Sequence, residues 1–257
     1  MRLPKRCGRL QRGGRTVYLD RLSTLKFREH AQLIDTVVLP VGSVEAHGYH
    51  CPLGTDNMIP AAILQQVEAM AGKRLFIAPA IPYGHTWELS VYPGTINVSA
   101  GAFSGYVSAV GQEFVRWGLK NVVILNGHGG NIGALTTAAE AIAEAAGPRG
   151  GGRCGAINWW IDFSQEILTV CETQGHAGED ETSVLRAIDD GLVDMKQASN
   201  NTYKPVFRYK ETGIGNRLFA MAQTGDARTA SAEKGQKILG LVARRVVELA
   251  EALREGK

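Results

Sequence analysis

The chain has 257 residues, of which 44% are hydrophobic and 21% charged, a globular composition that leaves little room for extended disorder. Its formal net charge is +3, but residues 1–16 carry six basic side chains and no acidic one, so the remainder is close to −3. A body of that charge excludes the broad basic face that binds nucleic acid.

We therefore expect a basic, flexible N-terminal arm at residues 1–16 and a single domain at residues 17–257. No apolar run approaches the roughly 20 residues that cross a bilayer, and the basic start lacks the apolar core of a signal peptide. The cysteines are far apart and form no CxxC, which indicates neither a disulfide framework nor a thiolate zinc site. These features predict a cytoplasmic protein with no membrane or nucleic-acid partner.

The first predicted strand covers residues 35–41, a β-branched run that stops at Gly42. Residues 42–56 are rich in Gly, His and Pro and predict a long loop. A helix should follow from Asn57 or Pro60 to Met70, with Asp56 or Asn57 as its cap.

Further strands and helices alternate along the rest of the chain. In order, we expect a strand at 75–81, a helix at 103–117, a strand at 121–125, a loop at 126–130, a helix at 131–146, a strand at 154–160, and helices at 181–189 and 231–254. This alternation predicts an α/β fold, a single-domain parallel sheet covered by helices on both faces. Ligands of such sheets bind beyond the carboxyl ends of the strands, so loops 42–56 and 126–131 should face one crevice.

Side chains of metal-ligand type gather in these two loops. Glu45 and His47 lie two residues apart, and in extended backbone they point to the same side. Asp56 stands where the loop turns into a helix, and His128 is flanked by glycines that allow close approach of a bound group. Two imidazoles and two carboxylates suit Zn²⁺, Mn²⁺ or Fe²⁺.

Glu181 could add a fifth ligand. If Asp56 bridges, these side chains suffice for two ions about 3.5–4 Å apart, which together activate a water and polarise a carbonyl. Taken singly, each residue is more often a turn residue or a hydrogen-bonding partner, so the combination carries the hypothesis. His85, near Trp87 and Tyr92, is equally consistent with lining a pocket and with capping a strand.

Three segments resemble the motifs of the creatininase (creatinine amidohydrolase) family. They read PVGSVEAHGYHCPLGTD at 40–56, NGHGGN at 126–131 and HAGEDETS at 176–183, and PGT at 93–95 is a further family element. The resemblance implies a creatininase-like α/β fold, two divalent metal ions per chain, and a homohexamer built as a trimer of dimers.

By this analogy Glu45 and His128 hold one metal, His47 holds the other, and Asp56 bridges them. Creatinine-hydrolysing members carry a metal-binding Glu two residues after the second-motif His, where this chain has Gly130. Glu181 is then the candidate for the vacant ligand position.

His176 aligns with the family's catalytic His, which would donate a proton to the departing nitrogen. Glu172, Glu179 and Asp180 could each orient it, and the sequence does not choose among them.

Two departures from the creatinine-hydrolysing pattern concern the substrate. Glu172 stands where those members carry a Trp four residues before the catalytic His, and Gly129 stands where they carry a Tyr. Trp160 could keep an aromatic wall or be part of the core. Trp160, Gly129, Glu172 and His85 are therefore the candidate substrate-binding residues.

The sequence thus predicts a metal-dependent amidohydrolase that cleaves a C–N bond of a small cyclic, creatinine-like amide. The alternatives within the family are a formamide deformylase, a keto-inositol hydrolase and a peptide-trimming hydrolase. A non-catalytic nucleotide-binding module is the alternative from another class, because GHGGN leads into a helix N-terminus that could cradle phosphate. It lacks GxxxxGK[ST], and GxGxxG fails at Ile132; the chain also has no GxSxG.

Overall fold

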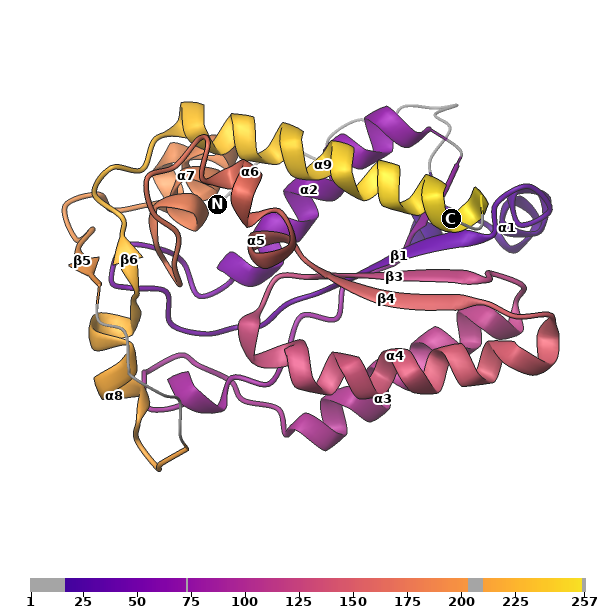
Figure 1. Ribbon diagram of the computed structural model, residues 1–257, viewed down its shortest axis with the longest axis horizontal. Helices are drawn as coiled ribbons and strands as arrows, with labels where there is room; N and C mark the ends of the chain where they lie inside the picture. The colour runs from indigo at the N-terminus through magenta and orange to yellow at the C-terminus, as the bar shows by residue number, and fades with distance from the viewer. Residues whose placement is uncertain (1–16, 73, 203–209, 256–257) are drawn as a thin grey trace, which may run out of the picture.

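The computed structural model describes residues 17–72, 74–202 and 210–255, so the expected basic arm lies outside the described residues. At its centre is a four-stranded parallel sheet with the strand order β2-β1-β3-β4. The strands are β1 (Thr36–Val41), β2 (Phe76–Ile77), β3 (Asn121–Asn126) and β4 (Arg153–Asn158). Helices lie on both sides of the sheet (Figure 1), which confirms the predicted α/β class.

Each face of the sheet has its own helical layer. The helices are α2 (Thr55–Ala71), α7 (Glu179–Ile188) and α9 (Ala232–Glu255) on one face, and α3 (Ala100–Arg116) and α4 (Ile132–Ala146) on the other. In Figure 1, α9 runs along the top of the molecule and α4 along the bottom. The two layers enclose two separate apolar cores.

Alternation along the central strands supplies both cores. Val37 and Leu39 of β1 pack toward α3 and α4, whereas Val38 between them packs toward α2 and α9. In β3, Ile124 packs in the core with α3 and α4, and Val123 packs in the core with α2 and α9. Since successive side chains on a strand point to opposite faces, a strand buried on both faces carries a continuous apolar run, as β1 does after Thr36 and β3 does between Asn121 and Asn126.

Shorter elements connect these layers. They are η1 (Leu19–Arg21), α1 (Thr24–His30), η2 (Trp87–Leu89), η3 (Gly129–Asn131), η4 (Gly147–Arg149), α5 (Trp159–Asp162), α6 (Ser164–Ile167), η5 (Asp190–Leu192), β5 (Asn200–Asn201), α8 (Gly215–Leu218), η6 (Ala220–Ala222) and β6 (Gly225–Asp226). Strands β5 and β6 pair antiparallel. Among the helices of the described residues, none combines the length and the hydropathy that crossing a membrane takes.

Several predicted boundaries were wrong: α3 and α7 begin at Ala100 and Glu179 rather than at residues 103 and 181. Three further differences have a structural cause or consequence. The strand expected at 75–81 is only the two-residue β2, because Pro79 has no N–H to continue the ladder, and pairing resumes only as a single bridge from Ile81 to Val41. Helix α2 begins at Thr55 after Gly54, so Asp56 lies inside the first turn and does not cap it. Strand β4 ends before Trp160, which lies in α5.

Candidate metal centre

The loops after β1 and β3 and the first turns of α2 and α7 meet at the carboxyl ends of the strands. There the structure brings together all five predicted ligand side chains, which we call the carboxylate–histidine cluster. Its ligand atoms fall into two groups whose members lie within 4.8 Å of one another, Glu45 with Asp56 and His128, and His47 with Asp56 and Glu181; in a third group, His176 from outside the cluster joins Glu45 and His47. Glu45 and His47 are fully buried, and the other members are nearly so.

Asp56 lies between the two histidines of the cluster. Its Oδ1 is 2.9 Å from His47 Nε2, and its Oδ2 is 3.1 Å from His128 Nδ1. His128 Nδ1 is also 3.1 Å from Glu45 Oε1, and His47 Nε2 is 3.7 Å from Glu181 Oε2. One carboxylate thus joins two triads of ligand atoms.

Close packing of backbone sets the position of Asp56. A Cβ atom at Gly127, just after β3, would lie 2.0 Å from the Asp56 carbonyl oxygen, so only glycine fits there. The Ser43 hydroxyl, just after β1, donates a 2.5 Å hydrogen bond to Asp56 Oδ2. The first turn of α2 is therefore held directly against the ends of the two central strands.

The ring nitrogens of His47 and His128 that face away from the cluster both contact backbone carbonyls. His47 Nδ1 lies 3.1 Å from the Glu45 carbonyl oxygen, and His128 Nε2 lies 2.9 Å from that of His85. Since a carbonyl oxygen only accepts, each of these nitrogens carries the proton. The opposite nitrogen of each ring is left to point into the cluster.

Burial and mutual attraction shift the pKa values of the cluster. Burial alone would lower the pKa of His47, but the carboxylates of Asp56, Glu181 and Glu45 raise it to about 10. Burial raises the pKa of Glu181 to about 8 and also raises the pKa of Glu45. Burial opposes ionisation of Asp56 too, yet the two imidazoles outweigh it and lower its pKa. The cluster therefore attracts positive charge.

His176 lies at the edge of the cluster. Its ring is 4.2 Å from the His47 ring between centroids, and its Nε2 donates a 2.8 Å hydrogen bond to the Ala46 carbonyl. Its Nδ1 is 3.6 Å from Glu45 Oε1. Burial lowers the pKa of His176 to about 3, so the ring is neutral at neutral pH, with an unprotonated Nδ1 facing the cluster.

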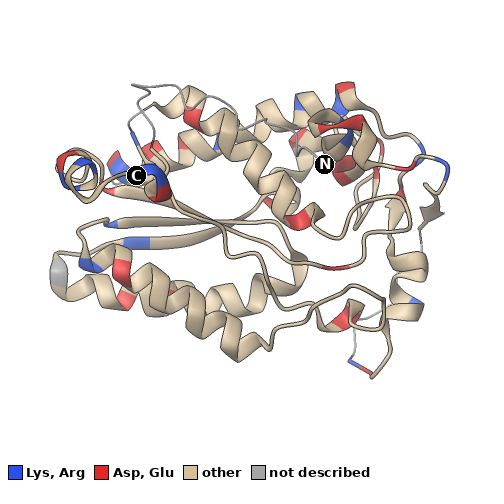
Figure 2. Cartoon of the chain, turned by 180° about the vertical axis from the view of Figure 1, so that it is seen from behind, with Lys and Arg blue, Asp and Glu red and all other residues tan. Residues whose placement is uncertain are grey.

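The acids that begin α7, coloured red in Figure 2, hold the loop that carries His176. Glu179 Oε2 accepts a 2.8 Å bond from the Thr173 N–H, and Asp180 Oδ1 accepts a 3.1 Å bond from the Gly175 N–H. These acids fix the backbone of the loop, whereas the ring is oriented by the Ala46 carbonyl. The sequence left open whether Glu172, Glu179 or Asp180 orients His176; in the structure the Ala46 carbonyl accepts the hydrogen bond of the ring, and Glu179 and Asp180 hold the backbone of its loop.

The four candidate substrate-binding residues lie in different surroundings. A Cβ atom at Gly129 would be 3.8 Å from Trp160 Cζ2, so these two residues are neighbours beside His128. His85 is half-buried, and its Nδ1 lies 3.0 Å from the Val98 carbonyl oxygen. Glu172 is exposed, and its backbone N–H donates to Glu179.

Phe219 is a residue of the site that the sequence did not reveal. Its half-buried ring packs edge-on against His176, with 5.6 Å between the centroids. The Tyr92 hydroxyl donates a 2.5 Å hydrogen bond to the Phe219 carbonyl. Phe219 lies 43 residues after His176 in a segment without a motif, so no local signal indicates this contact.

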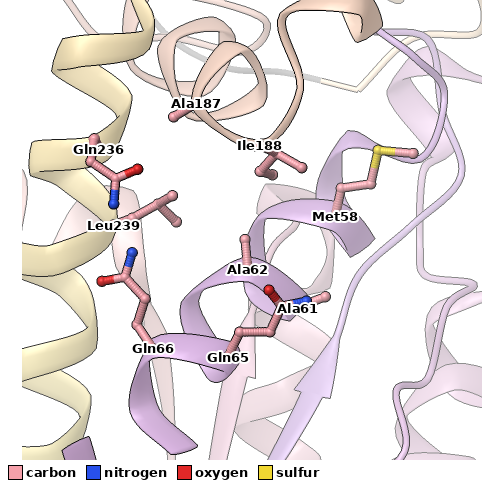
Figure 3. Close-up of a pocket in the computed structure, with 9 residues that line it drawn as sticks. All are labelled: Met58, Ala61, Ala62, Gln65, Gln66, Ala187, Ile188, Gln236 and Leu239. Carbon is pink, nitrogen blue, oxygen red and sulfur yellow. The ribbon is translucent and has the colours of Figure 1, made fainter. Parts of the chain in front are cut away.

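A groove lies between α2, α7 and α9 (Figure 3). Its volume is about 360 Å³. The lining residues are Met58, Ala61, Ala62, Gln65, Gln66, Ala187, Ile188, Gln236 and Leu239. None of these side chains belongs to the cluster or has a group that titrates near neutral pH, so the candidate site is the cluster and not the groove.

Comparison with protein families gives a match over most of the chain. The family model described as creatininase, creatinine amidohydrolase, matches residues 20–250. A mycofactocin precursor peptide peptidase of Mycolicibacterium smegmatis is 32% identical over 225 residues, which cover 84% of this chain and 85% of that protein. A creatinine amidohydrolase of Pseudomonas putida is 25% identical over 261 residues, which cover 94% and 97% of the two chains.

The fold is similar to that of solved structures. A structure described as "Creatininase Mn" superposes with a TM-score of 0.82 at 24% sequence identity, covering 94% of this chain and 98% of that chain.

Proposed function

The chain belongs to the creatininase family and is a hydrolase, and from this we propose that it uses two divalent metal ions to hydrolyse an amide C–N bond. The observation that carries the proposal is the place of Asp56, whose two carboxylate oxygens face His47 and His128. We assign residues 17–257 to a single hydrolase domain, and the hexamer and the cytoplasmic location stay predictions from the sequence.

The donor set fits metal ions. Both carboxylate oxygens of Glu45 are buried and accept no hydrogen bond from the described residues, an expensive arrangement unless a cation compensates it. We assign Glu45, Asp56 and His128 to one ion, and His47, Asp56 and Glu181 to the other. Nitrogen and oxygen donors suit Zn²⁺, Mn²⁺ or Fe²⁺. Ions so held would lower the pKa of a water and polarise the substrate carbonyl.

His176 is our candidate for the proton-transferring residue. Its Nε2–H is committed to the Ala46 carbonyl, so Nδ1 is the atom that can take a proton from the attacking water and pass it to the leaving nitrogen. The rings of His47 and Phe219 both pack against the His176 ring. The sequence predicted that His176 donates a proton; we propose that it first accepts this proton from the water and then donates it.

For the substrate we favour a peptide over a creatinine-like cyclic amide. The relative with 32% identity over 84% of this chain is a peptide peptidase, whereas the creatinine amidohydrolase is 25% identical. Gly129 places no side chain beside Trp160, and Glu172 is exposed, which suits a substrate larger than one small ring. The cyclic amide remains the alternative.

The test combines metal analysis with a substrate panel. The panel contains peptide amides, creatinine, a formylaminopyrimidine and a keto-inositol, assayed with metal-reconstituted protein. We expect His128→Ala to remove at least one metal per chain and all turnover, and His30→Ala, a histidine on α1, to change neither. Full activity of His128→Ala with unchanged metal content would refute the assignment.

A further inference from the structure

The side of His128 that faces away from the cluster is held by main chain. The His85 carbonyl oxygen lies 2.9 Å from Nε2, on the opposite side of the ring from Nδ1. His85 is far from His128 in sequence and belongs to the irregular segment after β2. The position of this single carbonyl therefore determines which nitrogen of His128 is available to a cation.

Asn131, fully buried at the start of α4, holds the segment that carries this carbonyl. Its Oδ1 accepts a 2.8 Å hydrogen bond from the His85 N–H, and its Nδ2 donates a 3.1 Å bond to the Gly42 carbonyl. One side chain thus ties the segment after β2 to the end of β1. Its loss would leave the His85 N–H without its buried partner.

Gly130 leaves the space that the His85 carbonyl occupies. A Cβ atom at Gly130 would lie 2.1 Å from the His85 carbonyl oxygen and 2.4 Å from His128 Nε2. The first of these contacts is with backbone, which cannot rotate away as the end of a flexible side chain can. At Gly133, one turn later, a Cβ atom would have nothing within 4 Å.

We propose that Gly130 and Asn131 are positioning residues that hold the His85 carbonyl against His128 and thereby set the metal affinity of the position formed with Glu45 and Asp56. The proposal rests on the proposed function, because it takes His128 as a ligand. Partners of a ligating histidine fix its tautomer and ring orientation, and their loss commonly weakens metal binding about 10- to 100-fold.

The experiment titrates Zn²⁺ into metal-depleted full-length protein in competition with a chromophoric chelator. We expect Gly130→Ala and Asn131→Ala to weaken one of the two sites about 10- to 100-fold. The matched control, Gly133→Ala, should bind both ions as the wild type does. Circular dichroism melts establish that each variant is folded. Wild-type affinity at both sites in a folded Gly130→Ala protein would overturn the proposal.

Nitrogen-15 NMR of the zinc-loaded wild type gives a readout that needs no variant at these positions. We expect the His128 ring to be protonated at Nε2 and coordinated through Nδ1; coordination through Nε2 overturns the proposal even if Gly130→Ala fails to fold. Failure of the proposed function looks different. In that case the wild type binds no stoichiometric Zn²⁺, or His128→Ala binds as much as the wild type.

Discussion

Replacing Lys234 with methionine tests how α7 and α9 are joined. Lys234 Nζ lies 2.5 Å from Glu179 Oε1, with the lysine side chain 27% exposed and the glutamate fully buried. Removing one partner of a buried ion pair costs about 3–5 kcal/mol, because the other charge is left uncompensated. Glu179 keeps its backbone donors on Oε2, including Thr173, so we expect the lower end, about 3 kcal/mol.

The assay is thermal unfolding followed by circular dichroism on metal-free protein. For a chain of this size, 3 kcal/mol corresponds to a fall in Tm of about 6–12 °C. Adding Glu179→Gln to Lys234→Met removes the unpaired charge and should recover most of the loss. The control is Lys237→Met on the same helix, whose pair with Glu233 is exposed and contributes about 0.3–0.5 kcal/mol.

The pH dependence of this effect has a definite sign. Burial raises the pKa of Glu179, but the Lys234 ammonium and the N–H groups of residues 172 and 173 outweigh it and hold the pKa below its usual range. An acid whose pKa is lower in the folded than in the unfolded state stabilises the fold at pH values above its unfolded pKa. That contribution is lost as the pH falls through the pKa of the folded state. The free energies of unfolding of the wild type and of Lys234→Met should therefore become equal in acid. A loss below about 1 kcal/mol at neutral pH, additive with Glu179→Gln, would refute the reasoning.

Two further predictions concern the carboxylate–histidine cluster and the contact between α7 and α9. Metal affinity should rise from about pH 6 to about pH 8 with release of protons, because the pKa values of His47, about 10, and Glu181, about 8, leave both groups protonated in the metal-free protein. Calorimetry in buffers of different ionisation enthalpy measures the number of protons released. A metal affinity that does not change with pH would contradict this prediction. Gly235→Ala should cost about 1–3 kcal/mol, since its Cβ atom would lie 1.9 Å from the Ser183 carbonyl oxygen. Gly240→Ala, whose Cβ atom would make ordinary contacts, is the matched control in the same unfolding assay and should not destabilise.

The sequence predicted the sheet because its central strands are buried on both faces. Val37, Val38 and Leu39 form an uninterrupted apolar run, and such a run needs no tertiary information to be read as a buried strand. The two loops that follow β1 and β3 were then placed together by the rule that parallel strands present their carboxyl ends at one edge. The convergence of Glu45, His47, Asp56 and His128 in space agrees with that reasoning.

Tertiary contacts explain what the sequence could not supply. The apolar run around β2 continues past Ile77, but Pro79 interrupts the ladder. Cap preferences placed the start of α2 too late: Gly54 precedes the helix without a side-chain cap, and the Asp56 carboxylate accepts a hydrogen bond from the Ser43 hydroxyl after β1 instead of capping the helix. The contact of Phe219 with His176 depends on how the segment after residue 210 folds back over the site. No periodic pattern in the sequence indicates this contact.

The first turn of α7 connects the stability of the fold to the chemistry of the site. Adjacent residues of a helix point in directions about 100° apart, so three consecutive acids reach three different neighbours. Glu179 pairs with Lys234 of α9, Asp180 holds the loop before His176, and Glu181 faces the cluster. The ion pair to α9 therefore helps to hold the backbone from which Glu181 extends. Weaker metal binding in Lys234→Met, where no ligand has been changed, would be the signature of that coupling.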